Sequence, residues 1–137
     1  MTVYYEDLTP GLSDTFSKTF SERDIALFGE VSGDMNPVHF DEAYAKKTIF
    51  RGRVAHGALT LSLLSAVLGT KLPGPGTVVL DFRTRFKGPV RIGDTVTAIC
   101  TVRELQPKRR VVFDCLCKVG DTVVVEGEAL VMAPVKP

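Results

Sequence analysis

The sequence of 137 residues contains no tryptophan, only three cysteines and two histidines, and no excess of either charge. Its 17 Lys and Arg against 16 Asp and Glu give a formal net charge of +1. No overall field therefore favours binding of nucleic acid or of an anionic membrane. The chain also lacks a basic face interleaved with aromatic side chains, which single-strand-binding proteins use. We expect neither nucleic acid nor a membrane as a partner.

Long apolar runs are missing as well. The most apolar segment, residues 58–68, is about half as long as the roughly 20 residues that a membrane-spanning helix needs. Residues 1–6 show no basic region followed by an apolar run, which is the pattern of a secretory signal. Cys100, Cys115 and Cys117 do not have the spacing of a zinc site, so we expect buried free thiols in a reducing compartment. The sequence predicts a cytoplasmic protein.

The remaining composition is that of one folded domain over residues 1–137. Hydrophobic residues make up 45% of the chain and charged residues 24%, which suits a chain with a real core and excludes disorder. In the segment 58–68 the apolar residues cover nearly the whole circumference of a helix. This pattern predicts a helix that the rest of the chain surrounds.

Strand-like alternation dominates the chain after this helix. Turn residues separate four segments that we expect to be strands, at 77–86, 95–105, 111–119 and 122–132. Short turns between them indicate an antiparallel meander. Before the apolar helix we expect a short strand at 14–20, a helix from Glu22 to Ser32 with Ser21 and Asp24 forming a capping box, and a short helix at 41–47. The order of elements indicates an α+β fold.

The segment 32–39 carries the residues best suited to chemistry. Gly33 ends a helix and we expect Pro37 not to start another, so Asp34, Asn36 and His39 are predicted on irregular backbone. A carboxylate and an imidazole five residues apart across such a turn can share one water and act as an acid/base pair. Each of these residues could instead have only a structural role, by capping a turn or by hydrogen-bonding a backbone carbonyl.

The second informative segment is Ala55-His56-Gly57, at the start of the apolar helix. Unpaired N–H groups and the helix dipole at Gly57 favour negative charge, so the oxygen of a thioester with enolate character could bind there. Alternatively, Gly57 serves only as a tight entry to the helix. We expect His56 to orient the loop rather than to perform chemistry.

Together the segments Ser32-Gly33-Asp34-Met35-Asn36-Pro37-Val38-His39 and Arg53-Val54-Ala55-His56-Gly57 resemble the signature of the (R)-specific enoyl-CoA hydratases, in the MaoC-like group of the hot-dog superfamily. The resemblance implies a hot-dog fold, in which an antiparallel sheet wraps around one long apolar helix. It implies a hydro-lyase that reversibly adds water, in syn fashion, to a trans-2-enoyl-CoA and yields an (R)-3-hydroxyacyl-CoA. It also implies a homodimer. We expect no metal or redox cofactor, because conjugation with the thioester already makes C3 electrophilic, and coenzyme A enters only as part of the substrate.

The family's roles can be carried over residue by residue. Asp34 and His39 match the pair that holds the water, and Asn36 matches the residue that orients this pair. Gly57 matches the glycine whose N–H polarises the thioester. Ser65 falls where similar bacterial enzymes place a polar residue facing the site.

Substrate contacts can be proposed as well. Leu64, Leu68 and Leu130 are expected to close the acyl pocket, which favours short or medium acyl chains. Arg85 and Arg109 belong to the two basic segments that could meet the phosphates of coenzyme A, although each segment could equally be a solvated face.

Other functions remain open. The nearest alternative is a dehydratase of (R)-3-hydroxyacyl groups on acyl carrier protein, and a further one is a non-catalytic acyl-binding subunit. The presence of both Asp34 and His39 disfavours the second. A hot-dog thioesterase is disfavoured because residues 58–68 contain no Asp or Glu.

Overall fold

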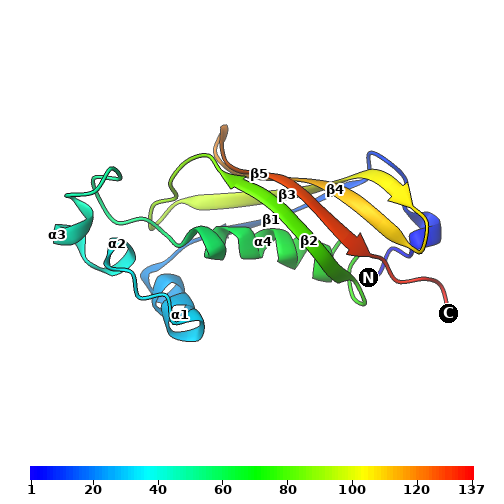
Figure 1. The fold of residues 1–137 in the computed structure, drawn as a ribbon, viewed down its shortest axis with the longest axis horizontal. Helices are drawn as coiled ribbons and strands as arrows, with labels where there is room; N and C mark the ends of the chain where they lie inside the picture. Colours follow the sequence, from blue (N-terminus) through cyan, green and yellow to red (C-terminus); the bar gives the residue numbers. More distant parts are fainter.

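A five-stranded antiparallel sheet covers one side of the long helix α4 (Figure 1). The computed structural model describes residues 1–137. The elements in chain order are η1 (Tyr5–Asp7), β1 (Ser13–Thr19), α1 (Glu22–Ser32), α2 (Pro37–Phe40), α3 (Glu42–Ala45), α4 (Gly57–Thr70), β2 (Val78–Phe86), β3 (Thr95–Gln106), β4 (Arg110–Val119) and β5 (Thr122–Met132). The strand order is β1-β3-β4-β5-β2, so β1 and β2 form the two edges. This α+β arrangement confirms the hot-dog fold predicted from the sequence.

Helix α4 is buried because its apolar residues meet the inner face of the sheet. Leu64 and Leu68 have no exposed surface, and Phe113 on β4 is equally buried. They belong to a hydrophobic cluster of 23 buried residues that α4 shares with the sheet. Neither α4 nor any other helix is long and apolar enough to cross a membrane.

The three cysteines lie on β3 and β4 and point into this cluster. All three are buried and none forms a disulfide, which confirms the expectation of buried free thiols. Loss of hydration raises the pKa of the Cys117 thiol to about 12. The hydrogen bond to Cys115, together with burial, raises the pKa of Cys100 as well. Both groups therefore stay protonated and unreactive in the folded chain.

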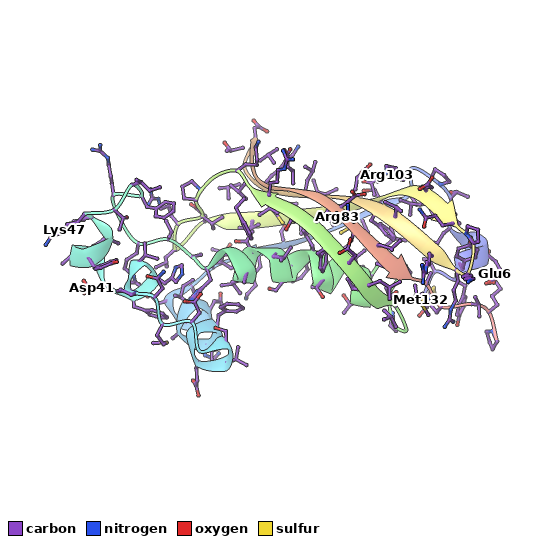
Figure 2. The ribbon with its side chains drawn as sticks, in the orientation of Figure 1. Glu6, Asp41, Lys47, Arg83, Arg103 and Met132 are labelled. Carbon is purple, nitrogen blue, oxygen red and sulfur yellow. The ribbon has the colours of Figure 1, made fainter.

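The short helices α1, α2 and α3 lie together beyond one end of the sheet (Figure 1). Figure 2 places Asp41 and Lys47 at this end and Glu6 at the opposite one. Helix α1 begins with the predicted capping box, in which Ser21 and Asp24 exchange side-chain and backbone hydrogen bonds. It ends at Gly33, whose φ of 79° suits glycine.

One prediction about this end is wrong. Pro37 was expected to prevent a helix, yet α2 begins at Pro37 with Asn36 as its N-cap. Proline is tolerated at the first helical position because the N–H that it lacks would have no partner there. The predicted helix at 41–47 is shorter in the structure, where α3 covers Glu42–Ala45. His39 therefore stands on a helical turn rather than on irregular backbone.

Candidate active site

Asp34 is held in place by the residues around it. The Ser32 hydroxyl accepts a hydrogen bond from the Asp34 N–H at 3.1 Å. Asp34 Oδ1 in turn accepts from the Asn36 N–H at 3.2 Å. The second carboxylate oxygen, Oδ2, lies 4.0 Å from Nε2 of His39. One oxygen of the carboxylate is thus used for orientation, and the other faces the imidazole.

His39 reaches the same place from helix α2. Asn36 Oδ1 caps this helix by accepting from the Val38 N–H at 3.2 Å. Nδ1 of His39 lies 2.7 Å from the carbonyl oxygen of Val54. Because a carbonyl only accepts, Nδ1 carries a proton and Nε2 is left free to face Asp34.

The gap between Asp34 and His39 suits a water molecule. At 4.0 Å it is too long for a direct hydrogen bond, but one water can bond to both groups across it. The side chain of His39 is 10% exposed and that of Asp34 is 48% exposed. The pair therefore has a sheltered imidazole and a carboxylate that solvent can reach.

His56 supports both residues from beneath. Its ring stacks on that of His39 with centroids 3.9 Å apart and an interplanar angle of 28°. Its Nε2–H donates to the backbone oxygen of Asp34 at 2.9 Å. Phe28 and Phe40 also contact this ring, and its loss of hydration lowers the pKa of His56 below the ordinary value. These contacts suit the orienting role expected for His56.

Gly57 opens helix α4 beside these side chains. As the first residue of the helix, it has an N–H with no acceptor inside the helix. A Cβ at this position would lie 2.8 Å from the ring of Phe86. Only glycine lets the start of α4 and the end of β2 approach so closely.

A cavity of about 500 Å³ is lined by His39, Gly57 and Thr60, among others. Asp34 itself is not one of its lining residues. Much of the remaining wall is apolar and comes from α2, the loop before α4, the end of β2 and β5. Asp34 lies at its side, with Oδ2 directed at His39. An apolar chamber with a water-binding pair and a helix N-terminus can hold and polarise a conjugated acyl group.

Asp34, His39 and His56 also place three possible metal-ligand atoms within 4.8 Å of one another. Each imidazole, however, already has one nitrogen next to a backbone carbonyl oxygen. The remaining nitrogen of His39, Nε2, faces Asp34 Oδ2 at 4.0 Å, and the remaining nitrogen of His56, Nδ1, has no partner.

Four of the predicted pocket residues lie away from this cavity. Ser65 is exposed on α4, whereas Leu64 and Leu68 are enclosed in the large hydrophobic cluster. Leu130 faces outward, because its neighbours Ala129 and Val131 on β5 are the residues that face α4. The apolar residues of α4 and β5 repeat with the same spacing in the cavity wall and in the core. Apolar spacing in the sequence therefore does not distinguish residues that line the cavity from residues of the core.

The two predicted basic contacts also lie elsewhere. Arg85 borders a shallow hollow of about 630 Å³ on the outer face of the sheet, which Arg83 and Arg103 share (Figure 2). Arg109 stands in the turn between β3 and β4, at the end of the sheet away from α1, α2 and α3 (Figure 1). Within one chain, neither lines the cavity. Lys87, which follows β2 directly, does.

Two arginines that sequence analysis missed hold the site together. Arg53 donates from Nε to the His39 carbonyl at 2.8 Å and pairs with Glu22 on α1. The hydrogen bond from Arg53 lowers the pKa of Glu22. Arg91 donates to the carbonyl oxygens of Phe50 at 2.5 Å and Gly52 at 3.1 Å. Nothing in the local sequence signals these contacts, because their partners lie 14 to 41 residues away.

Comparison with known proteins identifies the family of this chain. The model of the MaoC like domain family matches residues 10–118. An (R)-specific enoyl-CoA hydratase of Rhodospirillum rubrum is 51% identical over 134 residues, which cover 97% of this chain and 93% of that protein. A 3-hydroxybutyryl-CoA dehydratase of Methylorubrum extorquens is 49% identical and covers 98% of this chain and 86% of that protein.

Solved structures show the same relationship. The R-hydratase of Pseudomonas aeruginosa in its unliganded form superposes with a TM-score of 0.93 at 43% identity, covering 98% of this chain and 88% of that one. The sequence match and the fold agree. The chain belongs to the MaoC-like domain family.

Proposed function

We propose that this protein catalyses the reversible hydration of a trans-2-enoyl-CoA to an (R)-3-hydroxyacyl-CoA. The observation that carries the proposal is the 4.0 Å gap between Asp34 Oδ2 and His39 Nε2, beside the free N–H of Gly57. The names of the relatives from Rhodospirillum rubrum and Methylorubrum extorquens support this reaction and its reverse.

In the hydration direction, water between the two side chains attacks C3 of the substrate. Asp34 accepts one proton from this water, while the oxygen forms its bond to C3. His39 enters this step as an imidazolium with a proton on each nitrogen. Its Nε2 proton passes to C2, and its Nδ1–H stays on the Val54 carbonyl. Asp34 then returns its proton to His39, so that the enzyme is restored and one water has been added. Since both groups face the same gap, both new bonds form on one face of the double bond.

The N–H of Gly57 stabilises the negative charge that develops on the substrate between these steps. Attack at C3 moves electron density onto the thioester oxygen, which gains enolate character. The N–H of Gly57 and the positive end of the α4 dipole stabilise an oxygen bound there. Because the thioester already makes C3 electrophilic, the reaction needs no cofactor, and activity should survive dialysis against a chelator.

The test is the loss of enoyl-thioester absorbance with crotonyl-CoA and longer enoyl-CoAs, followed by chiral analysis of the product. Asp34→Asn and His39→Gln should each lower kcat by at least ~100-fold, as expected for a lost acid/base group. Asp121→Asn, in the turn between β4 and β5, is the matched control and should keep full activity. An (S) product, or near-native turnover in either site variant, would overturn the proposal.

The same assay separates acyl-CoA from the nearest alternative substrate. Enoyl groups on acyl carrier protein are compared with enoyl-CoA of equal chain length. We expect a higher kcat/KM with enoyl-CoA. A preference for the carrier protein would assign the chain to acyl-carrier-protein dehydration instead.

The nucleotide of coenzyme A requires cationic contacts. Lys87 is our first candidate because it lines the cavity, although it lies 3.5 Å from Glu126. Lys87→Glu should raise KM for enoyl-CoA and leave KM for a short enoyl-pantetheine unchanged. Arg109→Glu is the distant comparison. A rise in KM from Arg109→Glu alone would return the assignment to the turn predicted from the sequence.

Two exposed sheet edges support a homodimer. The edge strand β2 leaves Val78 51% and Leu80 43% exposed, and its outer backbone groups have no strand partner. A second copy can cover such an edge. Analytical ultracentrifugation should show a dimer, and a monomer at micromolar concentration would exclude this assembly.

A further inference from the structure

The hydroxyl of Thr60 is a buried polar group that the proposed reaction does not yet use. Thr60 lies on α4, one turn after Gly57, and is 1% exposed. Thr60 is one of the residues that line the cavity. Its Oγ1 has no hydrogen-bond partner in the structure. A buried hydroxyl without a hydrogen-bond partner reduces the stability of the fold. A bound ligand that accepts a hydrogen bond from it would supply the missing partner.

Other hydroxyls on the same helix behave differently. Ser62 donates to the carbonyl oxygen of Leu59 at 2.5 Å, and Thr70 donates to that of Ala66 at 2.6 Å. Such bonds back to the helix are the usual solution for Ser and Thr. Thr60 forms no such bond, so its buried hydroxyl is left without a partner in a residue that lines the cavity.

The other polar side chains of the cavity wall already have partners. Asn36 caps α2, and His39 is bonded to Val54 and faces Asp34. Lys87 lies 3.5 Å from Glu126. Only the Thr60 hydroxyl is both inside the wall and unpartnered.

Helix geometry directs this hydroxyl toward the start of α4. Residues three apart lie on the same face of a helix, so Thr60 follows Gly57 along the cavity side. Side chains on a helix also tilt toward its N-terminus, which brings Oγ1 toward the turn that carries the Gly57 N–H. An oxygen bound to that N–H therefore has a second donor beside it.

We infer that the Thr60 hydroxyl donates a second hydrogen bond to the thioester oxygen of the substrate, next to the Gly57 N–H. The inference rests on the proposed hydration of enoyl thioesters and adds a donor to the same site. The bond strengthens as the oxygen gains enolate character, so it acts mainly on the rate rather than on binding of the ground state. No proton is transferred from Thr60.

The decisive variant is Thr60→Val, which keeps the shape of the side chain and removes the hydroxyl. We expect kcat for crotonyl-CoA to fall about 10- to 100-fold, somewhat less than for a sole oxyanion donor because Gly57 remains, with KM within about threefold. Thr60→Ser should restore most of the activity. Thr70→Val, whose hydroxyl is bonded to its own helix, is the matched control and should retain full kcat.

Two further measurements separate a substrate contact from a structural role. Removing an unpartnered buried hydroxyl should leave Tm unchanged or raise it, while kcat falls. A bound 3-oxoacyl-CoA should form its enolate, seen by ultraviolet absorbance, at a higher pH in Thr60→Val than in the wild type. If Thr60→Val fails to fold, the same two measurements are made on Thr60→Ala.

Each result decides the inference. Native kcat in Thr60→Val, an unchanged enolate titration, or a loss of kcat accompanied by an equal loss in Thr60→Ser overturns it. In all three cases the wild-type protein still hydrates enoyl-CoA, so the proposed function stands. A wild-type protein without hydratase activity removes both proposals.

Discussion

The two ends of the molecule are held together by different interactions. Around α4 and the sheet, 23 buried residues form one continuous hydrophobic cluster, which also includes Ile25 of α1. At the end formed by α1, α2 and α3, the separate cluster contains only Val38, Ala45 and Val54. Arginine side chains that bind backbone carbonyls take the place of a core there, with Arg53 on His39 and Arg91 on Phe50 and Gly52.

The residues that stabilise the fold are therefore largely different from those that align Asp34 and His39. Asp34 and His39 stand at the end that has little core, and they are aligned by caps, carbonyl contacts and the stacked ring of His56. Directional hydrogen bonds fix orientation more closely than apolar contacts do. The protein can therefore lose the alignment of its site while its sheet remains folded.

The largest effect should come from the core. Leu64→Ala should lower the free energy of unfolding by about 2–5 kcal/mol, because a fully buried leucine leaves a cavity. Val38→Ala, in the small cluster, should lower it by about 1–2 kcal/mol, from the loss of two buried carbon atoms. Urea denaturation measures both. Equal losses would show that the two ends form one cooperative core and would break the comparison.

The second effect concerns the arginines of the site. Arg91→Met removes the donors that hold the segment carrying Phe50 and Gly52, and kcat should fall about tenfold, since bonds from a charged donor are worth ~1.5–3 kcal/mol. Arg103→Met is the matched control, because Arg103 pairs with Asp114 and Glu128 on the outer face of the sheet.

Arg103→Met should change neither kcat nor KM, since exposed ion pairs contribute little. Steady-state kinetics on both variants, alongside their melting curves, make the comparison. We call the end formed by α1, α2 and α3 the site end. If both arginines affect kcat equally, the polar contacts at the site end have no special role in aligning Asp34 and His39.

The sheet and α4 could be predicted from the sequence because their residues repeat with a fixed period. Alternation located β2 to β5 within a residue or two, and the continuous apolar stretch located α4. Periodicity says nothing about where the core ends and the cavity begins. For that reason Leu64, Leu68 and Leu130 were expected at the pocket, and the structure places them elsewhere.

The site end was predictable only where a residue has strong local chemistry. The capping box of α1, the glycine after it and the spacing of Asp34 and His39 are signals of this kind. The start of α2 at Pro37 is not predictable from proline alone, because the same residue that breaks a helix interior fits its first position. Contacts from Arg53 and Arg91 depend on the folded path of distant segments, so no local pattern carries them.

The smallest effect is a pH dependence of stability that arises at the site end. Burial lowers the pKa of His56 in the folded chain below its ordinary value of 6.5. Below about pH 6.5 the unfolded chain therefore takes up a proton that the folded chain resists, and the free energy of unfolding decreases as the pH falls. The carboxylates with lowered pKa values, Glu22 and Asp24, start from ordinary values of 4.5 and 3.8 and contribute only at lower pH.

Urea denaturation between about pH 7.5 and pH 5.5 tests this expectation in the wild type and in His56→Gln. The variant should be less stable at neutral pH, because it loses the stacking on His39, but its stability should change less across this range. An identical slope in the two proteins would mean that His56 accepts a proton as readily when folded as when unfolded. The ring stacked on His39 would then be hydrated like a surface group, and burial of His56 could not be what holds His39 in place.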